Sequence, residues 1–236
     1  MYLAVRNSRK PSFLTQRQTT LFFNMKILTP LYKLIDLRAA YRFLDSKLPD
    51  FFLPAVFNWF YKFSSDPFDL EKSDYEAHKF ALVAKCVQEI HVKNALDIGC
   101  GTGVLTEKIS HFCTHILGID FSTEAIETAK NRCAGQSNIR FLAADIRAFQ
   151  PPETYDLVLC SEVLYYVGEP DLEKFLGLLH VALSENGRLI VVDAADDGYT
   201  QSKLSQYFHL VKKSEERNWF RPFSVRVFAK IEPGQK

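Results

Sequence analysis

The chain has 236 residues, of which 47% are hydrophobic, and its formal net charge is +1 at pH 7. This length and apolar share are sufficient for one globular domain with a sizeable core. The charge balance provides no bulk basic field of the kind that attracts nucleic acid, so nucleic acid is not expected as a partner. No apolar run approaches the ~18 residues that a membrane span needs.

The five cysteines stand apart from one another, at positions 86, 100, 113, 133 and 160. None of them forms a C-x-x-C pair or joins a histidine at zinc-ligand spacing, so we predict neither a disulfide framework nor a metal site. Isolated cysteines are typical of proteins in a reducing compartment, and we therefore expect a cytoplasmic protein.

The first predicted unit, residues 1–24, contains four basic residues and no acidic residue. Such a start has two interpretations: it is a targeting peptide, or it is an over-extended start that precedes the true initiator, Met25. We favour the second interpretation. Under both of them we expect residues 1–24 to be a disordered extension.

The second predicted unit, residues 25–92, is helical and aromatic. The stretch 26–49 has the apolar spacing of one or two helices, and the stretch 51–63 contains seven aromatic side chains. Exposed, this aromatic block could make peripheral contact with a membrane surface or a lipid-linked substrate. We favour the alternative, in which the rings pack as a lid over the rest of the chain. A further helix, which should run to about Val92, places Tyr75 and Lys79 one turn apart on one face.

The stretch 94–109 predicts a strand, a glycine turn and a helix in that order. Ala95–Ile98 is typical of a buried parallel strand, and glycines follow at positions 99, 101 and 103 before an amphipathic segment. This is the half-unit on which nucleotides commonly bind. Glycine lets a ligand approach the backbone closely, and a helix start presents unpaired N–H groups to an anion.

The residues around these glycines discriminate between ligands. A dinucleotide fingerprint would need a third glycine at position 104, which is Val104, so a nicotinamide-dependent oxidoreductase is the weaker alternative. Instead Asp97 stands two residues before Gly99. An acid there can meet the ammonium group of an amino-acid moiety, whereas it would repel a pyrophosphate. The run Asp97-Ile-Gly-Cys-Gly-Thr-Gly103 resembles the first motif of the class I methyltransferases that use S-adenosylmethionine.

The second predicted strand, His115–Asp120, ends in an acid 21 residues after Gly99. In nucleotide-binding folds a carboxylate at this place meets the ribose hydroxyls. Phe121 follows and could press on one face of the adenine ring. Ser122 is a suitable N-cap for the next helix.

The fourth predicted strand, Tyr155–Ser161, is a continuous apolar run and is therefore expected at the centre of the sheet. Its carboxyl end lies across the topological switch point from the glycine turn, where ligands of open α/β sheets bind. Glu162, Tyr165 and Tyr166 are therefore our catalytic candidates on the acceptor side. Glu162 could hold or deprotonate an amine or hydroxyl, and the tyrosines could face the sulfonium through cation–π or O–H contacts.

The other predicted elements complete an α/β pattern. The third strand and its exit are expected over 139–146, and the fifth strand over 188–193. The helix before the fifth strand begins at Glu169-Pro170 and ends at Asn186-Gly187. A helix is expected over 202–208, and two final strands over 209–215 and 223–231. A terminal hairpin would give a mostly parallel sheet one antiparallel strand.

Residues from about Asp66 to Ile231 resemble the nodulation N-methyltransferases (NodS-like), a small-molecule branch of the class I methyltransferases. The resemblance is carried by Asp66-Pro-Phe, Tyr75-Glu-x-x-Lys79, the glycine motif and Ser161-Glu-Val-Leu-Tyr-Tyr. It implies a Rossmann-like α/β fold for the domain at 93–236, with helices on both faces and an N-terminal helical lid. The implied sheet has seven strands in the order 3-2-1-4-5-7-6, the last one antiparallel. Members of this branch methylate the free amine of a de-N-acetylated chitooligosaccharide.

The resemblance also implies roles for individual residues. It places Asp145 at the adenine amino group and the Ile146 N–H at a ring nitrogen, and it makes Tyr75 and Lys79 part of the closed cofactor pocket. The complete predicted cofactor set is Tyr75, Lys79, Asp97, Gly99, Cys100, Gly101, Gly103, Asp120, Phe121, Asp145, Ile146 and Ser161.

We therefore predict an S-adenosylmethionine-dependent methyltransferase. By in-line displacement it would move a methyl group to an amine or hydroxyl of a small molecule, an amino sugar or an oligosaccharide. Alignment can lower the barrier of such a reaction by ~7–11 kcal/mol, more than a base, so losing Glu162 should cost less than losing the cofactor contacts. The alternative is a methyltransferase-like subunit that binds cofactor or a partner without turnover. The acceptor and the oligomeric state are left open.

Overall fold

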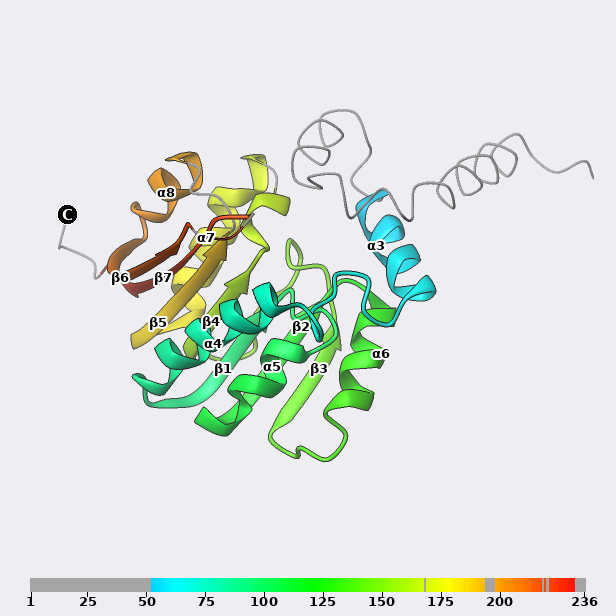
Figure 1. Cartoon of the computed structure of the whole chain (residues 1–236). Coiled ribbons are helices and arrows are strands. Elements are labelled where there is room, and N and C mark those ends of the chain that lie inside the picture. The colour runs from blue at the N-terminus through cyan, green and yellow to red at the C-terminus, as the bar shows by residue number, and fades with distance from the viewer. Residues whose placement is uncertain (1–51, 168, 194–197, 218, 220, 232–236) are drawn as a thin grey trace, which may run out of the picture. The chain divides into compact units, whose positions relative to one another are not determined.

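The computed structural model describes residues 52–167, 169–193, 198–217, 219 and 221–231 (Figure 1). The predictions for residues 1–24 and for helices within 26–49 lie outside the described residues. Among the described residues, no helix is both long enough and apolar enough to cross a bilayer.

Within the described residues, seven strands form one sheet in the order β3-β2-β1-β4-β5-β7-β6. The first five strands are mutually parallel, whereas β7 is antiparallel to both β5 and β6. The predicted strand order and the antiparallel last strand are therefore confirmed. The strands are β1 Val92–Ile98, β2 Cys113–Asp120, β3 Ile139–Ala143, β4 Tyr155–Ser161, β5 Leu183–Asp193, β6 Phe208–Glu216 and β7 Phe223–Lys230.

Helices cover both faces of this sheet (Figure 1). Strand β4 shows why every residue from 157 to 160 is apolar: Leu157 and Leu159 pack toward α4 and α5, and Val158 and Cys160 pack toward α7. Helix α6 packs on β2 and β3, at the edge of the sheet. The helices are α3 Phe52–Phe63, α4 Asp74–Gln88, α5 Val104–Ile109, α6 Thr123–Arg132, α7 Glu169–Ala182 and α8 Gly198–Leu204, with short 3₁₀ turns at Ser110–Phe112 and Leu164–Tyr166.

Three predicted boundaries differ from the structure. Helix α7 ends at Ala182, and β5 begins at Leu183, so the Asn186-Gly187 pair lies inside a strand and does not end the helix. Pairing explains this, because Leu183 lies opposite Tyr155 across a register shift in the β4–β5 ladder. Helix α4 ends at Gln88, short of the expected Val92, which instead begins β1, and α8 spans 198–204 and not 202–208. The predicted N-cap is confirmed: the Ser122 hydroxyl accepts from the Ala125 N–H at 3.2 Å.

Candidate functional site

The glycine loop after β1 has a backbone that only glycine adopts easily. Gly99, Gly101 and Gly103 have φ angles of 70°, 53° and 77°, in the left-handed region that disfavours a Cβ atom. A Cβ on Gly99 would lie 2.4 Å from Val163 Cγ2, and a Cβ on Gly101 would lie 3.2 Å from the Tyr61 hydroxyl. Conformation therefore favours glycine at all three positions, and at Gly99 a side chain would also clash with Val163.

Asp120, at the end of β2, joins this strand to the glycine loop. Its Oδ2 accepts the Gly101 N–H at 3.0 Å, and its Oδ1 accepts the Ser122 N–H at 2.9 Å. Burial raises the pKa of Asp120, while the N–H groups of Ser122, Gly101 and Phe121 oppose that shift. The structure thus brings the acid that ends β2 to the glycine loop, as its spacing from Gly99 had indicated.

Asp97 lies inside the protein, with a side chain that is 2% exposed. Its Oδ2 accepts the hydroxyl of Thr106, on α5, at 2.5 Å. Burial raises the pKa of Asp97 to about 7, Thr106 opposes the shift and Asp120 adds to it. Asp97 therefore connects β1 to α5 on the two sides of the glycine turn. Its contact with an ammonium group stays a prediction.

The backbone of Cys100 is part of the glycine loop, whereas its thiol is buried inside the protein. Burial raises the pKa of this thiol well above its ordinary value, and the carboxylates of Asp120 and Asp97 raise it further. All five cysteines of the chain are free and buried. Among the described residues, no group of three or more His, Cys, Asp or Glu side chains is placed to hold a metal ion.

Helix α3 lays aromatic side chains over the predicted cofactor residues. The Phe57 ring meets the rings of Phe121 and Tyr166 edge-on, at centroid distances of 5.3 and 5.4 Å. Burial raises the pKa of Tyr61 well above its ordinary value, and Asp120 raises it further. A packed aromatic block was expected here from the sequence, although Phe57 and Tyr61 were not among the predicted site residues. Their contacts with Phe121, Tyr166 and Gly101 join residues that are distant in the sequence, so no local signal could have identified these contacts.

On the acceptor side, Glu162 is held in a strained backbone position. Its φ is 59°, which costs a non-glycine residue about 1–2 kcal/mol. Its N–H donates to the Val192 carbonyl at 2.8 Å. Its Oε1 accepts from Lys79 Nζ at 3.1 Å, and its Oε2 accepts from the Tyr165 hydroxyl at 2.9 Å. Both carboxylate oxygens are therefore fixed, which is typical of a residue with a defined task.

Lys79, on α4, is 2% exposed and lies between two carboxylates, with Nζ 2.8 Å from Glu76 Oε2 and 3.1 Å from Glu162 Oε1. Burial disfavours its charge, but Glu162 and Glu76 outweigh burial, so the pKa of Lys79 lies above its ordinary value. The ring of Tyr75 lies 5.0 Å from Nζ. Lys79 and Glu162 were predicted on different sides of the site, and Glu76 was not predicted to belong to it. The three-residue spacing of Glu76 and Lys79 on one helix was the available signal.

The two predicted tyrosines lie in contact, with ring centroids 4.4 Å apart. Tyr165 reaches Glu162, whereas Tyr166 meets Phe57 of α3. Ser161 is half-buried at the end of β4. This pair of rings therefore links the acceptor side to the aromatic cover.

Asp145 and Ile146 lie in the loop after β3. Arg147 donates from Nε to Asp145 Oδ1 at 3.0 Å and from its terminal nitrogen to Oδ2 at 2.7 Å. These bonds hold the pKa of the Asp145 carboxyl below its usual value, although burial opposes the shift. Ile146 packs against the core on the α7 side of the sheet. Their predicted adenine contacts stay predictions.

A family model described as Nodulation protein S (NodS) matches residues 62–201. The Nodulation protein S of Rhizobium tropici is 30% identical over 135 residues, which cover 56% of this chain and 57% of that protein. The mitochondrial ubiquinone biosynthesis O-methyltransferase of Schizosaccharomyces pombe is 34% identical over 103 residues, which cover 42% of this chain and 37% of that protein. The chain spans about half the length of the curated relatives it matches.

Among solved structures, the N-methyltransferase NodS from Bradyrhizobium japonicum WM9, in complex with S-adenosyl-L-homocysteine, matches with a TM-score of 0.66 at 24% identity. The match covers 71% of this chain and 93% of that one. This similarity confirms the predicted Rossmann-like methyltransferase fold.

Proposed function

This chain belongs to the nodulation protein S family, and from that premise we propose that it is an S-adenosylmethionine-dependent methyltransferase. Its acceptor would be an amine or hydroxyl of a small molecule, an amino sugar or an oligosaccharide. The observation that carries the proposal is the junction of the glycine loop with Asp120, whose carboxylate accepts the Gly101 N–H at 3.0 Å. This junction joins the two positions at which class I methyltransferases are expected to hold the cofactor.

The residues present fit this cofactor chemically. The backbone at Gly101 carries no Cβ atom, so a ligand can approach it closely, and a Cβ there would already meet the Tyr61 hydroxyl at 3.2 Å. The carboxylate of Asp120 can accept hydroxyl donors, and the neighbouring Phe121 offers an aromatic face for a base. S-adenosylmethionine would supply a methyl group that is already activated on a sulfonium.

For the acceptor side we propose that Glu162 orients the acceptor. Lys79 and Tyr165 fix its two oxygens, and the ammonium of Lys79 favours the ionised carboxylate. An anion held in this way can accept an N–H or O–H of the acceptor and direct its lone pair. Alignment of this kind, together with exclusion of water by the aromatic side chains of α3, is what an in-line displacement needs.

The proposal is tested by calorimetric titration of the purified protein with S-adenosylhomocysteine. We expect micromolar binding, about −8 kcal/mol. The variant Asp120→Ala should lose this binding because the carboxylate that joins β2 to the loop is gone. The matched control is Glu185→Ala, an exposed acid near the opposite end of β5 from the site. Absence of binding by the wild-type protein would contradict the proposal.

An acceptor screen with labelled methyl donor then separates the two functional candidates. Amino sugars come first in the screen, followed by small amines and hydroxyl compounds. The second candidate is a methyltransferase-like subunit that binds cofactor or a partner without turnover. The Tyr61 hydroxyl lies against Gly101 and would have to move before a cofactor reaches this backbone. Cofactor binding without product from any acceptor would support that second candidate.

A further inference from the structure

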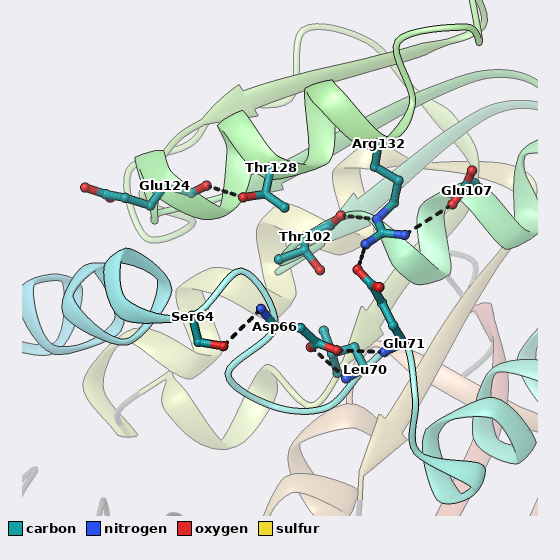
Figure 2. A network of polar contacts seen from close by, with 9 residues as sticks. All are labelled: Ser64, Asp66, Leu70, Glu71, Thr102, Glu107, Glu124, Thr128 and Arg132. Atoms are coloured by element: carbon teal, nitrogen blue, oxygen red, sulfur yellow. Dashed lines mark hydrogen bonds and ion pairs between the residues drawn. The ribbon is translucent and has the colours of Figure 1, made fainter. Parts of the chain in front are cut away.

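Arg132, the last residue of α6, connects three separate parts of the molecule (Figure 2). Its Nε donates to the Thr102 carbonyl in the glycine loop at 2.9 Å. One terminal nitrogen bonds the Glu71 carboxylate, in the segment that precedes α4. The other lies 3.7 Å from Glu107 Oε2 on α5. One guanidinium therefore contacts the loop, the helix after the loop and the segment 66–73.

The segment 66–73 is shaped to present Glu71 to this guanidinium. Asp66 accepts the Leu70 N–H on Oδ1 at 2.8 Å and the Glu71 N–H on Oδ2 at 3.0 Å, which folds the segment into a turn (Figure 2). Leu70 Cδ1 then lies 3.8 Å from the place where a Cβ on Gly101 would be. The turn therefore passes directly beside the bare backbone of the glycine loop, and Glu71 fastens it there through Arg132.

Arginine suits this place better than lysine. The planar guanidinium can donate to a main-chain carbonyl and to carboxylates at the same time, in fixed directions, whereas an ammonium is a point charge. Arg132 also lies between the carboxylates of Glu71 and Glu107, which would repel each other across the loop without it. Its side chain is 19% exposed, so solvent screens these contacts only in part.

We propose that Arg132 is a positioning residue for the cofactor: it holds the glycine loop in its binding conformation and fastens the segment 66–73 over the loop through Glu71. This inference rests on the proposed function and deepens it, because it assigns part of the cofactor affinity to a residue outside the predicted cofactor set. It also gives the Asp66-Pro-Phe stretch a physical role, as the turn that places Glu71.

The first test is calorimetry with S-adenosylhomocysteine on Arg132→Ala and Arg132→Lys. We expect roughly a tenfold loss of affinity for the alanine variant. The affinity of the lysine variant should lie between those of the alanine variant and the wild type. Lysine keeps the positive charge but lacks the planar guanidinium that donates to several acceptors at once. The control is Lys130→Ala, on the same helix, which removes an exposed ion pair with Glu127 at 2.8 Å and should leave the affinity unchanged.

A double-mutant cycle tests the coupling to the segment. Glu71→Gln should weaken binding about threefold in the wild-type background and have no further effect in the Arg132→Ala background, because its partner is already absent. Wild-type affinity in Arg132→Ala would overturn the proposal. So would a Glu71→Gln effect that is undiminished in that background.

Hydrogen exchange of the ligand-free protein provides a readout that does not depend on the cofactor. The amides of residues 101–103 and 69–73 should exchange faster in Arg132→Ala than in Lys130→Ala, and unchanged exchange would overturn the proposal. If the wild type fails to bind S-adenosylhomocysteine, the proposed function fails while the exchange experiment still decides the role of Arg132. If Arg132→Ala does not fold, Arg132→Lys and Glu71→Gln provide the same comparison.

Discussion

The two sides of the candidate site are built by different means. On the cofactor side, the backbone defines the site. Gly99 and Gly101 give the loop its shape through positive φ angles, and Asp120 accepts hydrogen bonds from main-chain N–H groups. On the acceptor side, contacts between side chains define the site: Glu162 is held by Lys79, which lies 83 residues away in the sequence. The first arrangement can be recognised in a local sequence pattern, whereas the second depends on how α4 docks against the end of β4. The comparison predicts that the two sides respond differently to substitution.

The largest expected effect is on the cofactor side. Gly101→Val should abolish S-adenosylhomocysteine binding, because a β-branched residue is strained at a φ of 53° and its Cβ would meet the Tyr61 hydroxyl at 3.2 Å. The measurement is calorimetric titration. Gly135→Val is the control, since a Cβ there meets nothing within 4 Å. Retained affinity in Gly101→Val would show that the cofactor does not approach this loop.

An intermediate effect is expected on the acceptor side. Glu162→Gln should lower kcat roughly 10–100-fold, because the amide keeps the shape but loses the charge that orients the acceptor. Affinity for S-adenosylhomocysteine should stay within about threefold of the wild type. Steady-state kinetics and calorimetry on the same preparation separate the two quantities. A parallel loss of cofactor affinity would mean that the two sides are not independent.

The smallest effect concerns pH and decides whether Asp97 belongs to the cofactor side. The pKa of Asp97 is raised to about 7, so its carboxylate is mostly protonated at pH 6 and mostly ionised at pH 8. An ammonium group binds the ionised form, so S-adenosylhomocysteine affinity should rise about tenfold from pH 6 to pH 8 and then level off. Ionisation of Asp120 would also raise the affinity with increasing pH. The variant Asp97→Asn removes the contribution of Asp97 alone, so any pH dependence of the affinity that remains in it belongs to Asp120. A flat wild-type profile would restrict Asp97 to its bond with Thr106.

The sequence was informative where a function follows from a local pattern. The apolar run before Gly99, the glycine spacing, the acid that ends β2 and the N-cap at Ser122 are all short-range features, and the structure confirms the elements that carry them. The strand order came from the family resemblance, because no local pattern specifies which strands become neighbours.

The contacts that the sequence analysis missed depend on tertiary packing. Glu76 becomes part of the site only because α4 brings Lys79 to Glu162, and Tyr61 only because α3 packs over Gly101. In the sequence Arg132 resembles an ordinary surface arginine at the end of a helix. Its partners lie in three other parts of the chain. Asp145 is a different case, since its partner Arg147 is only two residues away. Arg147 could be identified from the sequence as a neighbour of Asp145. The sequence did not show whether the Asp145 carboxylate binds Arg147 or a ligand.

The burial of all five thiols gives the protein a built-in reporter of its own motions. A thiolate is the reactive form, and burial raises the pKa of Cys100, Cys113 and Cys160, so each reacts with an alkylating reagent only when its surroundings open. Cys100 lies in the glycine loop itself, with Sγ 3.1 Å from the place where a Cβ on Gly118 would be. Its alkylation rate therefore measures how often the loop opens, while Cys160, in the central strand, measures unfolding of the sheet. The ratio of the two rates would compare the frequency of local opening with that of global unfolding, with the protein's own cysteines as the only labelled sites.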